Sequence, residues 1–575
     1  VGESYTFYGT VEGTLLRRTM TNPVFEREGL HAVTGRIVPV YPLTAGVGQS
    51  LLHRTIRQGL DEGADRLPDL LPAELRRQHG LCDVRYAYEN IHFPTDDAAL
   101  AAARRRLAFE ELYFLTLGLR LLRARRTTVK GKTCAAVDMT PFFGALPFSL
   151  TGAQVRAVDD ILRDMTAERP MNRLVQGDVG SGKTMVAAAG IYFAAKNGLQ
   201  AALMAPTEIL AEQHYHTLAL LLEKLGVRCA LLTASTKAKT RRSILEQLAA
   251  GEIDLAIGTH ALLSPDISYQ NLGLVVTDEQ HRFGVNQRAA LGAKGENPHL
   301  LVMSATPIPR TLALMIYGDL DVSVIDELPP GRRSIETYAV PSSYHERIYA
   351  FLEKQLAEGR QAYIVCPMVE ENGELPDERK AVTAYAEKLQ KEVFPNRTVR
   401  FLHGKMKAKE KETVMRALAA GEIDVLVSTT VVEVGVDVPN ASVMLIENAE
   451  CFGLSQLHQL RGRVGRGPWQ SYCILVSDNR GEDNKTRLDA MRRTQSGFAL
   501  AEEDLKLRGP GDFFGARQHG LPTLRVADFT CDMELLYEAQ GAAEALLALD
   551  PRLEGHPALH ARVRELFDLN AEALN

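Results

Sequence analysis

The chain has 575 residues, which is enough for about three or four domains that each bury a hydrophobic core. Its composition, with 45% hydrophobic and 24% charged residues, is typical of a soluble globular protein, and no apolar run reaches the ~18 residues of a membrane span. The net charge of −6 gives no global sign of a nucleic-acid-binding protein, and seven scattered cysteines without a CxxC pair argue against a disulfide framework or a zinc site.

The first quarter of the chain contains one strongly basic stretch. Residues 103–132 (ARRRLAFEELYFLTLGLRLLRARRTTVKGK) combine a helical pattern with many arginines and lysines. The pattern predicts either a solvated helix that joins two domains or a helix that contacts phosphate groups, and the sequence leaves both open. The chain begins with VGES rather than methionine, and we expect its first domain to be incomplete.

The segment GDVGSGKT (177–184) predicts a nucleotide-binding site, because it fits the pattern G-x-x-x-x-G-K-[ST] between an apolar strand and a helix-forming run. Glycines there allow main-chain N–H groups to surround phosphate oxygens. We expect Lys183 to reach the β- and γ-phosphates of ATP and Thr184 to bind Mg²⁺. The ATP contacts expected within this segment are Gly177, Gly180, Ser181, Gly182, Lys183 and Thr184.

A strand that ends in two carboxylates follows at LGLVVTDEQH (272–281). Asp278 at the strand tip is suited to bind Mg²⁺, directly or through water, and Glu279 is suited to activate the attacking water. Strands followed by surface acids are common, so this motif is a strong indication only because a phosphate-binding loop precedes it.

Seven residues, LAAGEID, occur at 248–254 and again at 418–424. The surroundings keep register, with Lys-Ala-Lys at 237–239 and at 407–409, and both copies predict a helix, a terminal glycine and a buried strand. The offset is about the length of one domain, so we predict two copies of one α/β domain. In the second copy the strand near 361–367 (QAYIVCP) continues without GKT, so only the first copy is expected to bind ATP.

The second copy contains QLRGRVGRG (459–467), which offers Arg461, Arg463 and Arg466 in a glycine-rich segment. An arginine inserted from a neighbouring domain stabilises the charge that develops on the γ-phosphate, with an effect of ~10³–10⁵ on the rate. We assign this role to Arg463 and Arg466 and expect Gln459 to orient the water or a phosphate oxygen. The alternative is a basic surface turn.

Several segments resemble those of superfamily 2 helicases, and more closely those of the RecG branch-migrating DNA helicases. The motor motifs are DEQH, SATPIPRTL (304–312), TTVVEVGVDVP (429–439) and QLRGRVGRG. The segment at 494–520 resembles the translocation segment of that family, and MTNPVFE (20–26) and GRIVPVYPLTAGVGQ (35–49) resemble its wedge, an OB-type β-barrel. The resemblance extends almost from end to end.

The resemblance implies roles for further residues. LTGAQ resembles the adenine-reading segment, with Gln154 as the amide that pairs with adenine. The implied DNA-binding residues are Thr207, Thr259, His403, Thr429 and, as a stacking candidate in the wedge, Phe25. The implied residues that couple the γ-phosphate to movement are Ser304, Thr306, Glu433, Gly435, Asp437, Arg508 and Arg517. The alternative for the threonines is helix capping, and for Arg508 a salt bridge to Glu502 or Asp504.

The implied fold is α/β, with two RecA-like lobes whose sheets are mostly parallel. A partial OB-type wedge and a helical linker precede the lobes, and a helical-hairpin translocation segment follows them. The expected boundaries are 1–70 for the wedge, 71–135 for the linker, 136–335 for lobe 1, 336–485 for lobe 2 and 486–575 for the hairpin and C-terminal segment.

The implied function is that of an ATP-dependent DNA translocase that remodels stalled forks and Holliday junctions by pulling duplex arms against the wedge, with ATP and Mg²⁺ as cofactors. The expected partners are branched and double-stranded DNA, and a single-strand DNA-binding protein is a further candidate. Both lobes are present in one chain, so a monomer can complete its own ATP site. The expected location is the cytoplasm, in association with the nucleoid, because the cysteine usage indicates a reducing setting.

Three other functions stay in competition with this one. Another superfamily 2 motor, such as an RNA helicase or a transcription-coupled repair translocase, would share the motor motifs, but the OB-like wedge joined to the motor argues against it. A slow nucleotide-switched scaffold would not need Glu279 together with Arg463 and Arg466. A motor that moves polypeptide would carry a long peptide-clamping insertion, which the sequence lacks.

Overall fold

The computed structural model describes residues 2–14, 17–21, 23–29, 34–44, 46–126, 131–278, 291–292, 294–305, 320–329, 333–367, 378–429, 438–508, 524–529 and 531–568. Six predicted site residues lie outside these ranges: Glu279, Thr306, Glu433, Gly435, Asp437 and Arg517. The chain divides into two compact units, of which unit 1 comprises Val1–Leu121 and Phe513–Leu574 and unit 2 comprises Leu122–Asp512 with Asn575. Within the described part of the chain, no helix combines the length and apolar character needed to cross a bilayer.

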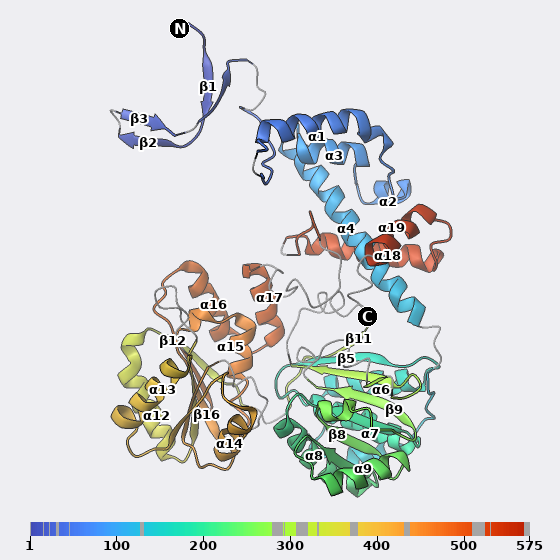
Figure 1. Ribbon diagram of the computed structural model, residues 1–575, viewed down its shortest axis with the longest axis vertical. Coiled ribbons are helices and arrows are strands. Elements are labelled where there is room, and N and C mark those ends of the chain that lie inside the picture. Colours follow the sequence, from blue (N-terminus) through green and yellow to red (C-terminus); the bar gives the residue numbers. More distant parts are fainter. Residues whose placement is uncertain are drawn as a thin grey trace. The chain divides into compact units, whose positions relative to one another are not determined.

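Unit 1 begins with four short strands, β1 (Tyr5–Tyr8), β2 (Val11–Thr14), β3 (Arg17–Met20) and β4 (Val24–Arg27). β1 pairs with β4 and β2 with β3, both antiparallel, so these strands form two two-stranded sheets (Figure 1). Phe7 lies opposite Phe25 in the β1–β4 pair, and their ring centroids are 5.6 Å apart. The closed OB-type barrel stays a prediction.

The other secondary structure described in unit 1 is helical, and its first helix begins at Gln49, within the range that the sequence analysis assigned to the wedge. They are α1 (Gln49–Gly63), α2 (Ala73–Gln78), α3 (Val84–His92), α4 (Asp97–Arg126), α18 (Met533–Leu549) and α19 (Pro557–Asp568).

Helix α4 contains most of the basic stretch. Its Arg104 pairs with Asp532 at 2.8 Å, Arg105 with Glu538 at 2.7 Å, and the fully buried Arg106 with Asp69 at 2.8 Å. The Glu111 carboxylate accepts the main-chain N–H groups of residues 525–527. Because Arg104, Arg105 and Arg106 are already paired with acidic side chains, this part of α4 is more consistent with a structural helix than with a phosphate-binding one.

Lobe 1 of unit 2 is built on a seven-stranded parallel sheet in the order β11-β5-β10-β9-β6-β8-β7. Its strands are β5 (Asn172–Gly177), β6 (Gln200–Met204), β7 (Cys229–Leu232), β8 (Leu255–Gly258), β9 (Leu272–Thr277), β10 (His299–Ser304) and β11 (Asp321–Ile325). Its main helices are α5 (Thr140–Ala145), α6 (Gly152–Thr166), α7 (Lys183–Lys196), α8 (Glu208–Leu222) and α9 (Ala238–Ala249).

Lobe 2 is built on a six-stranded parallel sheet in the order β12-β17-β16-β13-β15-β14. Its strands are β12 (Glu336–Val340), β13 (Gln361–Val365), β14 (Val399–Leu402), β15 (Val425–Ser428), β16 (Ala441–Ile446) and β17 (Tyr472–Val476). Its helices, and those that follow it in unit 2, are α12 (His345–Ala357), α13 (Glu378–Lys388), α14 (Ala408–Ala419), α15 (Leu454–Arg461), α16 (Glu482–Arg493) and α17 (Gly497–Arg508).

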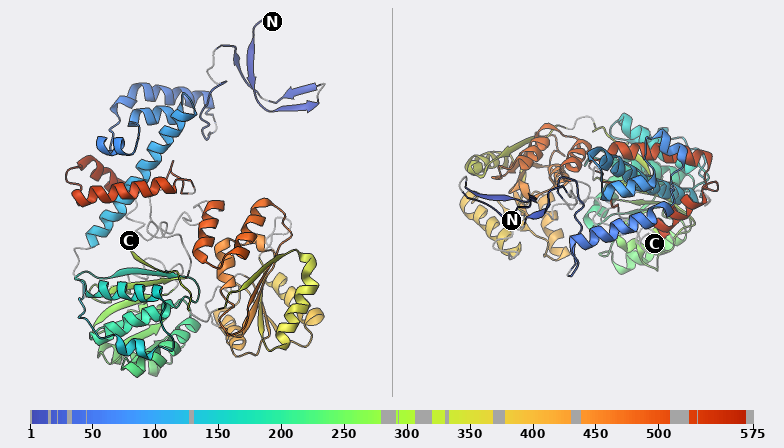
Figure 2. Two further views of the ribbon diagram at one scale, coloured as in Figure 1. Left: turned by 180° about the vertical axis from the view of Figure 1, so that it is seen from behind. Right: turned by 90° about the horizontal axis from the view of Figure 1, so that it is seen from above.

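Alternation along the buried strands of lobe 2 divides its core between the two faces of the sheet. In β13, Ala362 and Ile364 pack with α12 and α13, whereas Tyr363 and Val365 pack with α14, α15 and α16. Side chains of successive strand residues point to opposite faces, so one apolar run supplies both cores. The rear view shows the sheet of lobe 2 with helices on both sides (Figure 2).

Each strand of lobe 2 has a counterpart in lobe 1, which confirms the prediction of two copies of one domain. The order β17-β16-β13-β15-β14 repeats the order β10-β9-β6-β8-β7, and β12 and β5 pair with β17 and β10 at equivalent places. The strand near 361–367 is therefore the counterpart of β6, and the prediction that it matches the phosphate-binding strand was wrong. The true counterpart, β12, is an edge strand with exposed residues, so its sequence pattern is weaker than that of a central strand.

The repeated LAAGEID sequence ends a helix and attaches it to the sheet. Gly251 and Gly421 adopt positive φ angles of 74° and 78°, the left-handed conformation that terminates helices. In lobe 1 the Gln200 side-chain amide donates to the carbonyls of Leu248 (3.0 Å) and Ile253 (2.8 Å). In lobe 2 the same bonds join Gln361 to Leu418 (2.7 Å) and Ile423 (2.6 Å).

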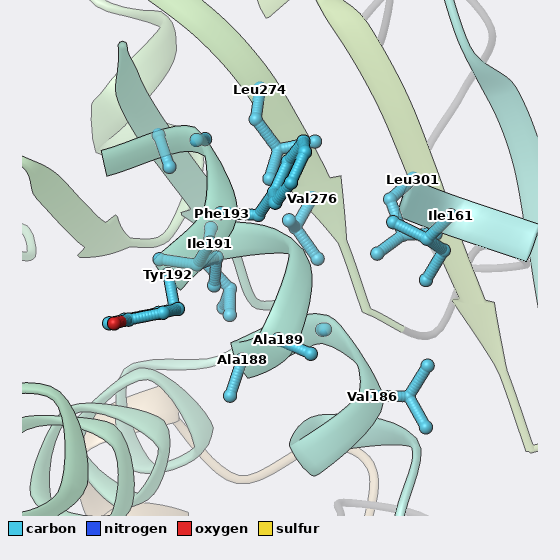
Figure 3. Close-up of a cluster of buried hydrophobic side chains, with 14 of the residues drawn as sticks. Ile161, Val186, Ala188, Ala189, Ile191, Tyr192, Phe193, Leu274, Val276 and Leu301 are labelled. Carbon is cyan, nitrogen blue, oxygen red and sulfur yellow. The ribbon is translucent and has the colours of Figure 1, made fainter. Parts of the chain in front are cut away.

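Helix α7, which follows the phosphate-binding loop, lies in the core of lobe 1. All its residues from Met185 to Ala194 are buried, as expected of a helix that is apolar on every side. Figure 3 shows its side chains among those of α6, β9 and β10, for example Ile161, Leu274 and Leu301. This packing fixes the helix whose first residue is Lys183.

Candidate nucleotide-binding site

The phosphate-binding loop joins the end of β5 to the start of α7 and requires glycine at two positions. Gly180 and Gly182 have φ angles of 76° and 83°, which side chains rarely adopt. At Gly182 a β-carbon would also lie 2.3 Å from Nε2 of Gln154. Gly180 is therefore needed for the backbone turn, and Gly182 is needed both for the turn and for the close approach of the Gln154 side chain.

Lys183 is buried, and its ammonium group lies on the loop itself. Nζ donates to the carbonyl oxygens of Gly177 at 2.7 Å and Asp178 at 2.9 Å. The group thus lies beside the main-chain N–H groups of the loop, where a phosphate would bind. Thr184 follows it at the start of α7 and is partly exposed.

Gln154 is fully buried and connects α6 to the loop. Its Oε1 accepts the N–H of Thr151 at 2.8 Å in a capping box, and its Nε2 donates to the carbonyl of Ser181 at 2.8 Å. The structure therefore brings the predicted adenine-reading residue to the phosphate-binding loop.

Asp278 lies at the tip of β9, two strands from β5 in the sheet. Its main-chain N–H donates to Met204 at 3.0 Å, and its Oδ2 lies 2.8 Å from Nε2 of His214 on α8. Both side chains are about nine-tenths buried. Sequence reasoning missed His214, although it stands only two helical turns after Thr207.

The equivalent place in lobe 2 is filled by protein side chains. His345 begins α12 as Lys183 begins α7, and Glu447 follows β16 as Asp278 follows β9. Nε2 of His345 lies 3.0 Å from Oε2 of Glu447, and the Tyr385 hydroxyl donates to Oε1 at 2.8 Å. This arrangement supports the prediction that only lobe 1 binds ATP.

The three arginines of QLRGRVGRG have different surroundings. Arg461 is buried at the end of α15 and donates to the carbonyls of Met491 (2.8 Å) and Thr494 (3.0 Å), so it holds the connection to α17 and is no candidate for insertion beside a phosphate. Gly462 follows it and lies so close to the loop that a β-carbon would be 2.9 Å from Cβ of Val179. Arg463 and Arg466 come directly after this contact with the loop. Gln459 lies on α15, four residues before Arg463.

Asp178 is a loop residue that the sequence analysis did not single out. Its Oδ1 lies 3.3 Å from Nε2 of His458 on α15, and its Oδ2 accepts the N–H of Gly497, the first residue of α17, at 3.0 Å. Burial raises the pKa of Asp178, but the hydrogen bonds from His458 and Gly497 and the charge of Lys183 outweigh burial and hold the pKa below its ordinary value.

Comparison with known proteins identifies the family of this site. Residues 151–315 match the DEAD/DEAH box helicase family, residues 345–468 the helicase conserved C-terminal domain, and residues 494–574 the C-terminal part of domain 3 of ATP-dependent DNA helicase RecG. The chain is 47% identical to the ATP-dependent DNA helicase RecG of Synechocystis over 97% of this chain and 68% of the relative. It is 48% identical to that of Bacillus subtilis over 94% of this chain and 80% of the relative.

The chain belongs to the RecG family. A solved structure of RecG bound to a three-way DNA junction is similar to it as well, with a TM-score of 0.73 and 42% identity over 92% of this chain and 70% of that chain. The resemblance suggested by the motor motifs and the translocation segment is thereby confirmed.

Four of the residues that the RecG resemblance assigns to DNA follow the carboxyl ends of strands in the two lobes. Thr207 follows β6 and caps α8 by accepting the N–H of Leu210 at 3.3 Å, and the buried Thr259 caps a short helical turn after β8. Thr429 is buried after β15, and His403 after β14 stacks on Phe401. Helix capping therefore occupies the hydroxyls of the two lobe 1 threonines.

Three remaining predicted residues lie in different places. Ser304 ends β10 and is buried beside Gln176 of β5, one residue before the phosphate-binding loop begins. Phe25 lies on β4 with 59% of its surface exposed. Arg508 is the last residue of α17.

Proposed function

We infer that this chain is an ATP-dependent DNA helicase that remodels branched DNA in recombination and repair. The observation that carries this inference is the identity of 42–48%, over nearly the whole chain, with RecG helicases that include one bound to a three-way DNA junction. The complete phosphate-binding loop of lobe 1, with α15 of lobe 2 against it, supports hydrolysis of ATP within one chain. A monomer would therefore suffice.

The residues of the site supply the chemical groups that phosphoryl transfer requires. A phosphate oxygen is a stronger acceptor than a carbonyl, so bound ATP would draw the Lys183 ammonium away from Gly177 and Asp178. The Thr184 hydroxyl and the Asp278 carboxylate are oxygen donors of the kind that Mg²⁺ prefers, and the ion would neutralise charge on the β- and γ-phosphates. Glu279 would activate the water. Arg463 and Arg466 would stabilise the γ-phosphate, Gln459 would orient the water and Gln154 would read adenine.

The proposed DNA contacts form two groups, one in the lobes and one in the β1–β4 region. Loop groups beside Thr207, Thr259, His403 and Thr429 would hold phosphates without reading sequence, since phosphate contacts position a strand and carry no base information. Duplex arms would be pulled against the β1–β4 region, where exposed Phe25 would stack on a base. A single-strand DNA-binding protein is a further proposed partner at such junctions.

The test is the steady-state rate of ATP hydrolysis without nucleic acid, with single-stranded RNA, with linear duplex DNA and with a model fork. One salt concentration must be kept, because affinity for phosphates falls steeply with salt. We expect the fork to stimulate hydrolysis most. Stimulation by RNA alone would contradict the DNA assignment, and no stimulation by any nucleic acid would favour the nucleotide-switched scaffold.

A further inference from the structure

We propose that Asp178 is a positioning residue that connects the nucleotide-binding loop to α15 and to the first turn of α17, and so transmits the state of the ATP site to the segment after lobe 2. This proposal rests on the proposed function, because it assumes that lobe 1 binds ATP. It adds a residue of the loop whose side chain faces another part of the motor instead of the nucleotide.

The carboxylate of Asp178 uses its two oxygens for two different elements. Oδ1 lies 3.3 Å from Nε2 of His458 in α15, and Oδ2 accepts the N–H of Gly497 at 3.0 Å. The first N–H groups of a helix have no partner within the helix, so Gly497 needs an acceptor from elsewhere. An anion is favoured at that end of α17 because of the helix dipole. Both side chains, Asp178 and His458, are strongly shielded, with 14% and 6% exposed.

The bonds of His458 fix which of its ring nitrogens carries the proton. Nδ1 lies 2.9 Å from Nη2 of Arg461, and a guanidinium can only donate hydrogen bonds. Nδ1 must therefore accept, which leaves the proton on Nε2, the nitrogen that lies 3.3 Å from Oδ1 of Asp178. Arg461 in turn donates to Met491 and Thr494. The link from Asp178 thus reaches the α16–α17 connection by a second route, in addition to the direct bond to Gly497.

The main chain of Asp178 is joined to the catalytic lysine. Its carbonyl oxygen accepts from Lys183 Nζ at 2.9 Å, while its side chain holds α17. A phosphate that draws Nζ away would release the carbonyl of the residue whose carboxylate caps α17. A change at the phosphate therefore acts directly on the residue that restrains the first turn of this helix, as switches driven by γ-phosphate contacts require.

The first test is hydrogen exchange of the main-chain amides at residues 497–501, with and without Mg²⁺ and a non-hydrolysable ATP analogue. In the unchanged chain we expect the analogue to alter the exchange rate. In Asp178→Asn the amide can accept from only one of the two donors and would present its own donor to the other. We expect exchange to be about tenfold faster in this variant, equivalent to one lost hydrogen bond to a charged group, and to be independent of the analogue.

The matched control is Asp138→Asn, because the exposed Asp138 also accepts a main-chain N–H at a helix start, that of Thr140 at 2.9 Å, outside the nucleotide loop. It should leave exchange at 497–501 and its response to the analogue unchanged. This measurement needs nucleotide binding and no DNA, so it can fail or succeed whether or not branched DNA is the substrate. An exchange response that persists in Asp178→Asn, or that is absent from the unchanged chain, overturns the proposal.

The second test measures fork strands separated per ATP hydrolysed. We expect Asp178→Asn and His458→Leu to lower this ratio about tenfold, and the double variant to be no worse than either, because both interrupt one link. His458→Gln should restore much of the ratio, since its amide can still donate toward Asp178. If hydrolysis and strand separation fall in parallel, so that the ratio stays constant, Asp178 serves the ATP site alone and the proposal is wrong.

Discussion

Lobe 1 and lobe 2 share the order of their equivalent strands and the hydrogen bonds around LAAGEID, but the segments that follow the equivalent strands β5 and β12 differ. After β5 the chain forms a glycine-rich loop with Lys183, whereas after β12 it runs through Pro341 to His345, which pairs with Glu447. A loop with left-handed glycines leaves main-chain N–H groups available for an anion. The two copies thus differ in one short segment, which supports the prediction that only lobe 1 binds nucleotide.

The largest expected difference between the lobes is in hydrolysis. Lys183→Ala should lower the fork-stimulated rate by about 10²–10³-fold, because a charged donor to the transferred phosphate is lost. The counterpart variant His345→Ala should keep the rate within about threefold, since His345 bonds only within lobe 2 in the described structure. Steady-state hydrolysis at saturating ATP measures both. Equal losses in two folded variants would contradict the assignment of the site to lobe 1.

The next effect concerns stability and the buried glutamines. Replacing Gln361 by Leu removes its hydrogen bonds to the carbonyls of Leu418 and Ile423, of which Leu418 keeps the N–H of Gly421 at 3.0 Å, at a cost of about 1–3 kcal/mol. Gln200→Leu should cost more, because the Gln200 Oε1 also accepts the N–H of Asn271 at 2.9 Å. Thermal unfolding of the two variants shows which substitution lowers the stability more. The reverse order would show that the repeated bonds are not equivalent.

A smaller effect is expected at the helix-ending glycines. Alanine at a positive φ angle costs about 1–2 kcal/mol, which applies to Gly251 and Gly421 alike. At Gly251 a β-carbon would also lie 1.8 Å from Oε1 of Gln270, whereas nothing lies within 4 Å at Gly421. Gly251→Ala should therefore lower the melting temperature more than Gly421→Ala. Equal values would mean that the Gln270 side chain moves aside without cost.

The smallest effect is a pH dependence at the end of LAAGEID. Burial raises the pKa of Asp254, but the hydrogen bonds from Arg228, at 2.9 Å from Nε and 2.8 Å from the main-chain N–H, outweigh it and hold the pKa below its ordinary value. A lowered pKa means that the stabilisation is present above the unfolded value of about 4 and is lost as pH falls through the folded value. The difference in melting temperature between the unchanged chain and Asp254→Asn should therefore shrink from pH 7 to pH 3.5. A difference that is constant over this range would exclude a charge effect.

The sequence by itself determined the features whose signal is local. The phosphate-binding loop, the strand that ends in Asp278 and the repeat at LAAGEID depend on residues close together in the chain, and the structure places each on the expected element. Such patterns are readable because backbone geometry and burial impose them within a few residues.

Only the tertiary structure decided which distant groups meet. It showed that edge strand β12, and not β13, matches β5, because strand order is set by pairing across the sheet. It showed that Arg461 is a buried support of the connection to α17, and it brought Asp178 to Gly497. These contacts join residues separated by long stretches of chain, and their geometry depends on how whole elements pack, which no local spacing encodes.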